Sequence, residues 1–208
     1  MAEHGRLGPI EWAATWRPLP GQRVCGDRSI AVDVNGTGAL LGVLDGLGHG
    51  AEAAEAANCG VDVLGEARAE PLDVLVQRCH RALSNTRGVA MTLARIDFRV
   101  NTVSWVGIGN VAADLVAKYP AGVEVRSSAL LAGGIVGYRI PEVLTLQAVP
   151  IRPGDLLVFA SDGIADSHLD DIDFSTPASA IAEKILHSHA MGNDDALVLT
   201  ARHRGTSP

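Results

Sequence analysis

The 208-residue sequence has few cysteines and few aromatic residues. Its three cysteines, Cys25, Cys59 and Cys79, are odd in number and show no CxxC spacing. This count argues against a disulfide framework and against a zinc site built from thiolates. We therefore interpret the cysteines as small apolar residues of the core.

Basic clusters are also missing. The formal net charge is −7 and aromatic residues make up only 4% of the chain. Proteins that bind nucleic acids usually carry a basic patch, and those that bind single strands add aromatic stacking platforms. We therefore expect no nucleic-acid partner.

Long hydrophobic runs are absent as well. No stretch approaches the roughly 18 consecutive apolar residues of a membrane helix, and the first ten residues, MAEHGRLGPI, lack a signal-peptide pattern. We expect a soluble, cytoplasmic protein with no membrane partner. With 47% hydrophobic residues and no visible linker or repeat, residues 1–208 are predicted to form a single domain that acts as a monomer.

What is present is an alternating hydrophobic pattern typical of strands. It predicts strands at 10–16 and 30–34, a tight hairpin turn at the NGTG segment 35–38, and a strand after it that is apolar on both faces. Further strands are expected at 89–97, 102–110, 111–119, 123–131, 144–149, 155–161 and 196–201.

Helical composition appears in three places. Two helices are predicted in succession over 51–70 and 71–83, although Gly60 and Gly65 disfavour an unbroken first helix, and a third is predicted over 176–189. Runs of strands beside segregated helices favour an α+β fold over a doubly wound parallel sheet.

Several aspartates lie next to segments that should be buried strands. Asp45 and Asp162 end two of these strands as Asp-Gly, Asp27 precedes another, and Asp194 and Asp195 precede the last. A carboxylate near a core is costly unless it is paired or ligated, and turn chemistry explains one such position better than four. Hard divalent cations prefer oxygen ligands, and two cations about 3.5–4 Å apart can share a carboxylate and activate a water. Neighbouring glycines would let ions or phosphate approach closely.

Four motifs occur in order: Gly26-Asp27, D-G-L-G-H-G at 45–50, Ser161-Asp162-Gly163 and Asn193-Asp194-Asp195. Over residues 20 to 200 this set resembles the PPM, or type 2C, serine/threonine phosphatases, and more narrowly their SpoIIE-like branch. The resemblance implies a four-layer α/β/β/α sandwich of two antiparallel sheets flanked by helices. In size the chain is most similar to the stand-alone RsbX-like phosphatases of the stressosome.

The resemblance also implies roles for these residues at a site with two Mn²⁺ or Mg²⁺ ions. Asp45 would bridge the ions and the carbonyl of Gly46 would complete the shell of one of them. Asp162 and Asp194 would ligate the other ion, and Asp27 would hold a metal or its bound water.

Three assignments are more open. Asp195 is the alternative to Asp194 as a metal ligand. His49 is a candidate general acid, because histidine often serves in this role, but its spacing from Asp45 differs from that in eukaryotic members, so shaping the loop or capping the next helix is an alternative. Asn110 stands where the wider family has an aspartate that helps hold a third metal, which favours a two-metal site.

The resemblance predicts metal-dependent hydrolysis of phosphoserine or phosphothreonine on proteins. Phosphorylated STAS-domain proteins of the RsbS or RsbR type are the expected partners, with negative feedback on a stress response as the outcome. The alternatives are the same chemistry on an anti-anti-sigma factor, as in RsbU or SpoIIE, and a catalytically weak module that binds phosphoserine as a switch.

Overall fold

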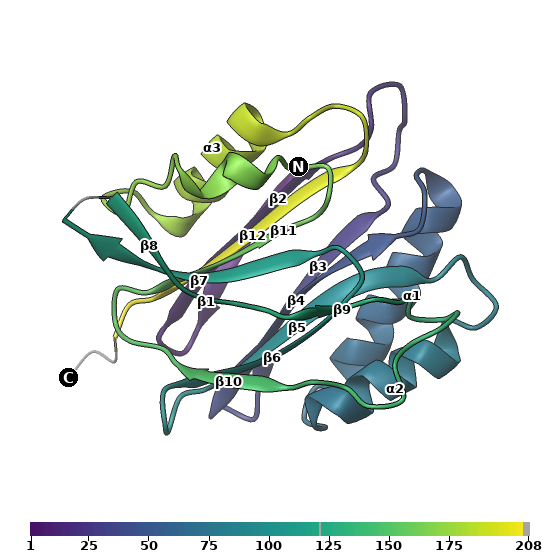
Figure 1. Ribbon diagram of the computed structural model, residues 1–208, viewed down its shortest axis with the longest axis horizontal. Helices are drawn as coiled ribbons and strands as arrows, with labels where there is room; N and C mark the ends of the chain where they lie inside the picture. The colour runs from purple at the N-terminus through teal and green to yellow at the C-terminus, as the bar shows by residue number, and fades with distance from the viewer. Residues whose placement is uncertain (121, 206–208) are drawn as a thin grey trace.

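The computed structural model describes residues 1–120 and 122–205. Two β-sheets packed face to face form the centre of the molecule (Figure 1). The first, sheet A, is antiparallel with the strand order β1-β2-β12-β11-β7-β8. Its strands are β1 (Ala2–Leu7), β2 (Ile10–Arg17), β7 (Ala112–Tyr119), β8 (Gly122–Ser128), β11 (Leu156–Ala160) and β12 (Ala196–His203).

The second sheet, sheet B, has the order β10-β6-β5-β4-β3, and a short β9 pairs with β6 in parallel. All other pairs in sheet B are antiparallel. Its strands are β3 (Asp27–Val34), β4 (Gly38–Gly46), β5 (Val89–Asp97), β6 (Thr102–Ile108), β9 (Leu131–Ala132) and β10 (Gln147–Pro150).

Helices cover the outer face of each sheet (Figure 1). The helices α1 (Ala51–Glu66) and α2 (Leu72–Ala82) pack on sheet B, whereas α3 (Ala178–His189) packs on sheet A. A short 3₁₀ helix, η1 (Asp166–Leu169), follows β11. The four-layer α+β sandwich predicted above is therefore confirmed. No helix among the described residues is long and apolar enough to cross a membrane.

The position of strand β4 between two core layers explains why its sequence is almost entirely apolar. Leu40 and Leu44 face the layer between sheet B and the helices, and Leu41 and Val43 face the layer between the two sheets. A strand covered on both faces needs apolar residues at every position rather than at alternate ones. The continuous run therefore places the end of β4, with its aspartate, at the edge of a rigid core.

Three of the differences between the structure and the sequence predictions have a clear physical reason. Strand β1 was missed, because its burial is slight and it lies at the edge of sheet A. The short β9 lies at the end of the predicted strand 123–131, beyond β8. Helix α1 runs unbroken through Gly60, where a Cβ atom would lie 2.5 Å from Leu44 Cδ2. Glycine here lets the helix approach the sheet, a gain that offsets its low helix propensity.

Candidate active site

The predicted acidic residues meet at one end of the sandwich. Asp27 begins β3 and pairs across the strands with Asp45 near the end of β4. From sheet A, Asp162 lies just beyond β11 and Asp194 just before β12, and these two strands are neighbours. Each sheet thus contributes two aspartates, and residues far apart in the sequence are brought together.

Burial and mutual repulsion perturb these carboxyl groups. Burial, followed by the charges of Asp27, Asp162 and Asp194, raises the pKa of Asp45. Burial also raises the pKa of Asp27, opposed by the hydroxyl of Ser161 and supported by its acidic neighbours. For Asp162, burial and Asp194 raise the pKa. Like charges directly opposite on paired strands destabilise a sheet, so this end of the molecule carries an electrostatic cost.

The donor set fits a hard divalent cation. The Oδ2 atom of Asp27 is buried and has no hydrogen-bond partner, and a buried charged oxygen without a partner is costly. The side chains gathered here offer carboxylate oxygens, the ligands that Mg²⁺ and Mn²⁺ prefer. Among residues 1–120 and 122–205, no three acidic, histidine or cysteine side chains already surround one point in a geometry that holds an ion.

The neighbouring residues Asp194 and Asp195 do different things. Asp195 is buried, and its two carboxylate oxygens accept hydrogen bonds from the backbone amides of Leu19 and Gly26, each at 2.7 Å. Asp194 is half-buried and accepts a hydrogen bond from the backbone amide of Asp195 at 2.8 Å. Asp195 therefore anchors the loop before Asp27, and the assignment of Asp194 as the metal ligand stays a prediction.

The glycines of the motifs have packing reasons of their own. A Cβ atom on Gly46 would lie 2.1 Å from the carbonyl oxygen of Ala53 in α1, and one on Gly163 would lie 1.9 Å from the carbonyl oxygen of Asp195. Both distances are far inside van der Waals contact, so the backbone at these positions accepts no side chain. These two glycines bring neighbouring backbone against the acidic cluster, a role that the sequence interpretation, which stressed space for ligands, did not foresee.

The family model described as "Stage II sporulation protein E (SpoIIE)" matches residues 35–204 of this chain. The chain belongs to the SpoIIE family. These are PPM-type phosphatases, and the family predicted from the four ordered motifs is confirmed.

Curated and solved relatives agree with this assignment to the SpoIIE family. The phosphoserine phosphatase RsbX of Bacillus subtilis (strain 168) is 29% identical over 91 residues, which cover 44% of this chain and 45% of RsbX. The match thus spans less than half of the length of that relative.

Among solved structures, a chain described by the words "The bacterial stressosome: a modular system that has been adapted to control secondary messenger signaling" has a TM-score of 0.83 and 28% identity, covering 93% of this chain and 99% of its own. A structure of RsbX in complex with magnesium has a TM-score of 0.80 and 20% identity, covering 97% of this chain and 99% of that one. At this identity the second match shows a shared fold.

His49, the fifth residue of the D-G-L-G-H-G motif of this SpoIIE-family chain, is exposed. Helix α1 begins beyond it with Gly50 as the N-cap, and no side chain caps the helix by a hydrogen bond. The structure therefore gives no capping role to His49, and its role as a general acid stays a prediction.

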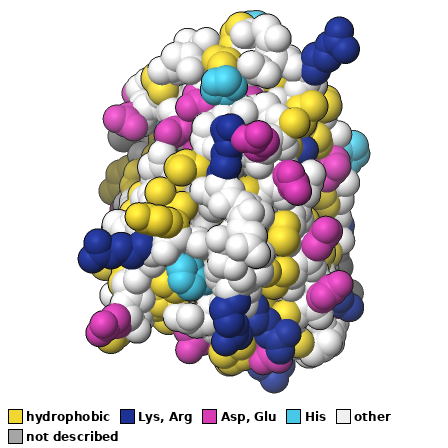
Figure 2. All heavy atoms as spheres, turned by 90° about the vertical axis from the view of Figure 1, so that its right-hand side faces the viewer, with side chains coloured by type: hydrophobic (Ala, Val, Ile, Leu, Met, Phe, Trp, Pro, Cys, Tyr) yellow, Lys and Arg dark blue, Asp and Glu magenta, His cyan; other side chains and the backbone are white. Residues whose placement is uncertain are grey.

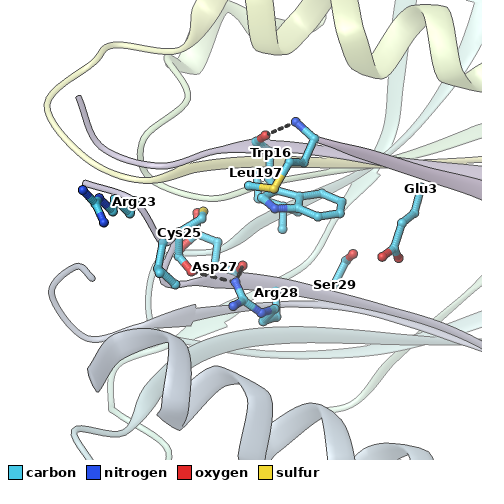
Figure 3. Close-up of a pocket in the computed structure, with 10 residues that line it drawn as sticks. Glu3, Trp16, Arg23, Cys25, Asp27, Arg28, Ser29 and Leu197 are labelled. Carbon is cyan, nitrogen blue, oxygen red and sulfur yellow. Dashed lines mark hydrogen bonds between the residues drawn. The ribbon is translucent and has the colours of Figure 1, made fainter. Parts of the chain in front are cut away.

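Three arginines, Arg17, Arg23 and Arg28, lie in the segment that leads into Asp27 and β3, and the structure gives them different contacts. Arg28 donates hydrogen bonds to the carbonyls of Cys25 and Asp27 at 2.6 and 2.7 Å, and Arg17 donates to the carbonyl of Ala190 at 2.9 Å. These two guanidinium groups fix the backbone around the site. Arg23 is exposed and lies at the rim of a cavity of about 290 Å³ beside Asp27 (Figure 3).

Cys25 lies on the wall of the same cavity, between Arg23 and Asp27 (Figure 3). Burial, and next the charge of Asp27, raises the pKa of this thiol to about 12. A thiol with this pKa is protonated at neutral pH and is a poor nucleophile. Cys25 is therefore a core residue, as the sequence indicated.

The face on the right of Figure 1 is turned toward the viewer in Figure 2, where acidic side chains are spread among uncharged ones and the basic side chains gather mainly toward its lower end.

The sequence analysis singled out Asn110 but did not predict its contact. In the structure, Nδ2 of Asn110 donates a hydrogen bond to Oδ2 of Asp162 at 2.7 Å. A polar residue just past the end of β6 was the available signal, because the predicted aspartates occupy similar strand-end positions.

Proposed function

We propose that this chain is a metal-dependent protein phosphatase that removes phosphate from phosphoserine or phosphothreonine. In this proposal Asp45 would be shared by two Mn²⁺ or Mg²⁺ ions, and Asp27, the Gly46 carbonyl, Asp162 and Asp194 would supply the other protein ligands. The observation that carries it is the meeting of four aspartates at one end of a PPM-type sandwich, with a buried and unpaired oxygen on Asp27.

Divalent cations, when bound, activate water as a nucleophile and offset charge on the phosphoryl group. The fold of the protein sets the positions of the carboxylates. Pairing of β3 with β4 sets Asp27 opposite Asp45, and Asp195 fixes the loop that leads into Asp27 through the amides of Leu19 and Gly26. Burial, followed by the charge of Asp27, raises the pKa of the Cys25 thiol, which makes it a poor nucleophile. We therefore propose direct hydrolysis by water.

We further propose that the substrates are phosphorylated STAS-domain proteins of the RsbS or RsbR type, and that the reaction gives negative feedback on a stress response. Support comes from the 28% identical chain whose description names the bacterial stressosome and from the likeness to RsbX, which is named a phosphoserine phosphatase. A single catalytic domain that acts as a monomer in the cytoplasm is part of this proposal.

The chemical part is tested with para-nitrophenyl phosphate and Mn²⁺. The wild type should turn the substrate over, and Asp45→Asn should not. No turnover by the wild type would reject the enzyme and leave the phosphoserine-binding switch as the better account. Turnover that survives the substitution would instead reject the role proposed for Asp45.

The substrate part needs phosphoproteins. The purified chain is incubated with phosphorylated RsbS-like, RsbR-like and anti-anti-sigma STAS proteins, and the release of phosphate is compared at equal concentrations. Faster release from the RsbS or RsbR type supports the stressosome role. Faster release from the anti-anti-sigma factor would replace it by the RsbU-like alternative.

A further inference from the structure

The turn that carries Asn110 is held firmly on both sides. Before it, the backbone amide of Gly109 donates to the carbonyl of Ala132 at 2.9 Å, and Gly109 has φ of +92°, where a Cβ atom would meet that of Ala90 at 2.4 Å. After it, the carbonyl of buried Val111 accepts a hydrogen bond from the hydroxyl of Thr92 at 2.6 Å. Asn110 thus projects from a backbone with little freedom to move.

Asp162, in contrast, is the exposed member of the acidic cluster. Its backbone is fixed, because Gly163 packs against the carbonyl of Asp195, but an exposed carboxylate is free to rotate unless another group holds it. The hydrogen bond of 2.7 Å from Asn110 Nδ2 engages its Oδ2 atom. A neutral amide can do this without adding a charge to a cluster already crowded with acids.

We propose that Asn110 is a positioning residue that holds Asp162 in the orientation in which it binds a divalent cation. The inference rests on the proposed function. An amide that donates to one oxygen leaves the remaining lone pairs of the carboxylate as acceptors for an ion, which is how hydrogen-bonded outer partners commonly orient metal ligands. Asn110 acts through Asp162 and needs no contact with the substrate.

The test measures Mn²⁺ affinity by isothermal titration calorimetry on the full chain after treatment with a chelator. Asn110→Ala should weaken the binding of Mn²⁺ by about 10- to 100-fold, the usual cost of losing an outer partner of a ligand. Its unfolding temperature without metal should match the wild type, because Asn110 is exposed. Asn85→Ala, at another exposed asparagine, is the matched control and should bind Mn²⁺ as the wild type does.

A double-mutant cycle distinguishes positioning from a general effect. In an Asp162→Ala background, Asn110→Ala should have no further effect on Mn²⁺ affinity, because the group that it positions is gone. Unchanged affinity in the single variant, or an equal loss in the Asp162→Ala background, would overturn the inference while the proposed function stands. A wild type that binds no Mn²⁺ would instead overturn the proposed function and this inference with it.

Discussion

The two sheets hold their aspartates by different means. On sheet B, Asp27 and Asp45 belong to paired strands, so the register of the sheet itself sets them opposite each other. On sheet A, Asp162 and Asp194 lie in the turns beyond β11 and before β12, where hydrogen bonds and tight glycine packing set the backbone and side chains. Asp27 is buried and Asp45 and Asp194 are half-buried, whereas Asp162 is exposed. The strand-held half therefore carries a larger electrostatic cost than the turn-held half. In the proposed metal site, strand register thus positions one half and side-chain hydrogen bonds position the other.

The largest expected effect comes from the strand-held half. Asp45→Asn keeps the shape of the side chain but removes the proposed bridging carboxylate, so kcat/KM for para-nitrophenyl phosphate with Mn²⁺ should fall by about 1000-fold, or about 4 kcal/mol of transition-state stabilisation. Steady-state kinetics measure it, and circular dichroism verifies the fold. A loss below about tenfold would mean that the strand-held half is not the centre of the site.

Substitution of one glycine in each half allows the packing of the two halves to be compared through the free energy of unfolding. Gly46→Ala and Gly163→Ala would each force a Cβ atom against a backbone carbonyl, at 2.1 and 1.9 Å, so both should destabilise the protein by about 3 kcal/mol. Gly65→Ala is the control, because no atom lies within 4 Å of its Cβ position, and in a helix it should stabilise by about 1 kcal/mol. Urea unfolding of the three variants measures these changes. Equal stability of Gly46→Ala and wild type would argue against tight packing at the end of β4.

Substitutions at the adjacent residues Asp194 and Asp195 distinguish metal binding from anchoring of the backbone in the turn-held half. Asp195→Asn replaces one acceptor by a donor that faces a backbone amide, so stability should fall by about 1–3 kcal/mol. Asp194→Asn should leave stability nearly unchanged and reduce Mn²⁺ affinity. Thermal unfolding and calorimetric titration of the two variants, side by side, give the result, and the reverse pattern would exchange the roles of the two residues.

The raised pKa values of the two aspartates on sheet B predict that the stability of the protein depends on pH. The pKa values of Asp27 and Asp45 are raised in the folded protein, whereas in the unfolded chain they lie near the ordinary value of about 3.9. Above that pH the folded state binds more protons than the unfolded state, so the stability of the chelator-treated protein should decrease as pH rises from 5 to 8.

Urea midpoints at several pH values, with a chelator present, measure this slope. Asp45→Asn should reduce it, because the substitution removes one of the two charges that face each other across the strands. Stability that rises with pH over this range in the wild type would contradict the prediction.

The smallest effect is expected outside both halves, at His49. The imidazole is exposed, and a general acid normally contributes about 10²- to 10⁴-fold. We expect His49→Ala to reduce kcat by less than about tenfold. A loss above about 100-fold, together with the loss of the basic limb of the pH–rate profile, would establish the candidate general acid after all.

Sequence patterns predicted most of the fold because its elements are strongly periodic, because β4 is apolar up to Asp45, and because β12 begins with an apolar run. They missed β1, whose side chains are mostly exposed and show no clean alternation. For the site, the strand-end aspartates were found from sequence since a carboxylate after an apolar run is unusual. The hydrogen bond from Asn110 to Asp162 and the anchoring by Asp195 were not found from the sequence. Both depend on contacts between residues at least 52 positions apart, and no local pattern encodes such contacts.

Strand β12 has a consequence for the synthesis of the protein. It lies between β2 and β11 in sheet A, although its residues, Ala196–His203, follow those of every other strand in that sheet. A nascent chain that lacks them leaves an edge of β2 and an edge of β11 without a partner, and such edges invite association with other chains. The anchoring carboxylate of Asp195 also arrives only at this stage. The complete sheet A, and with it the anchor that Asp195 provides, can therefore assemble only after β12 has been made.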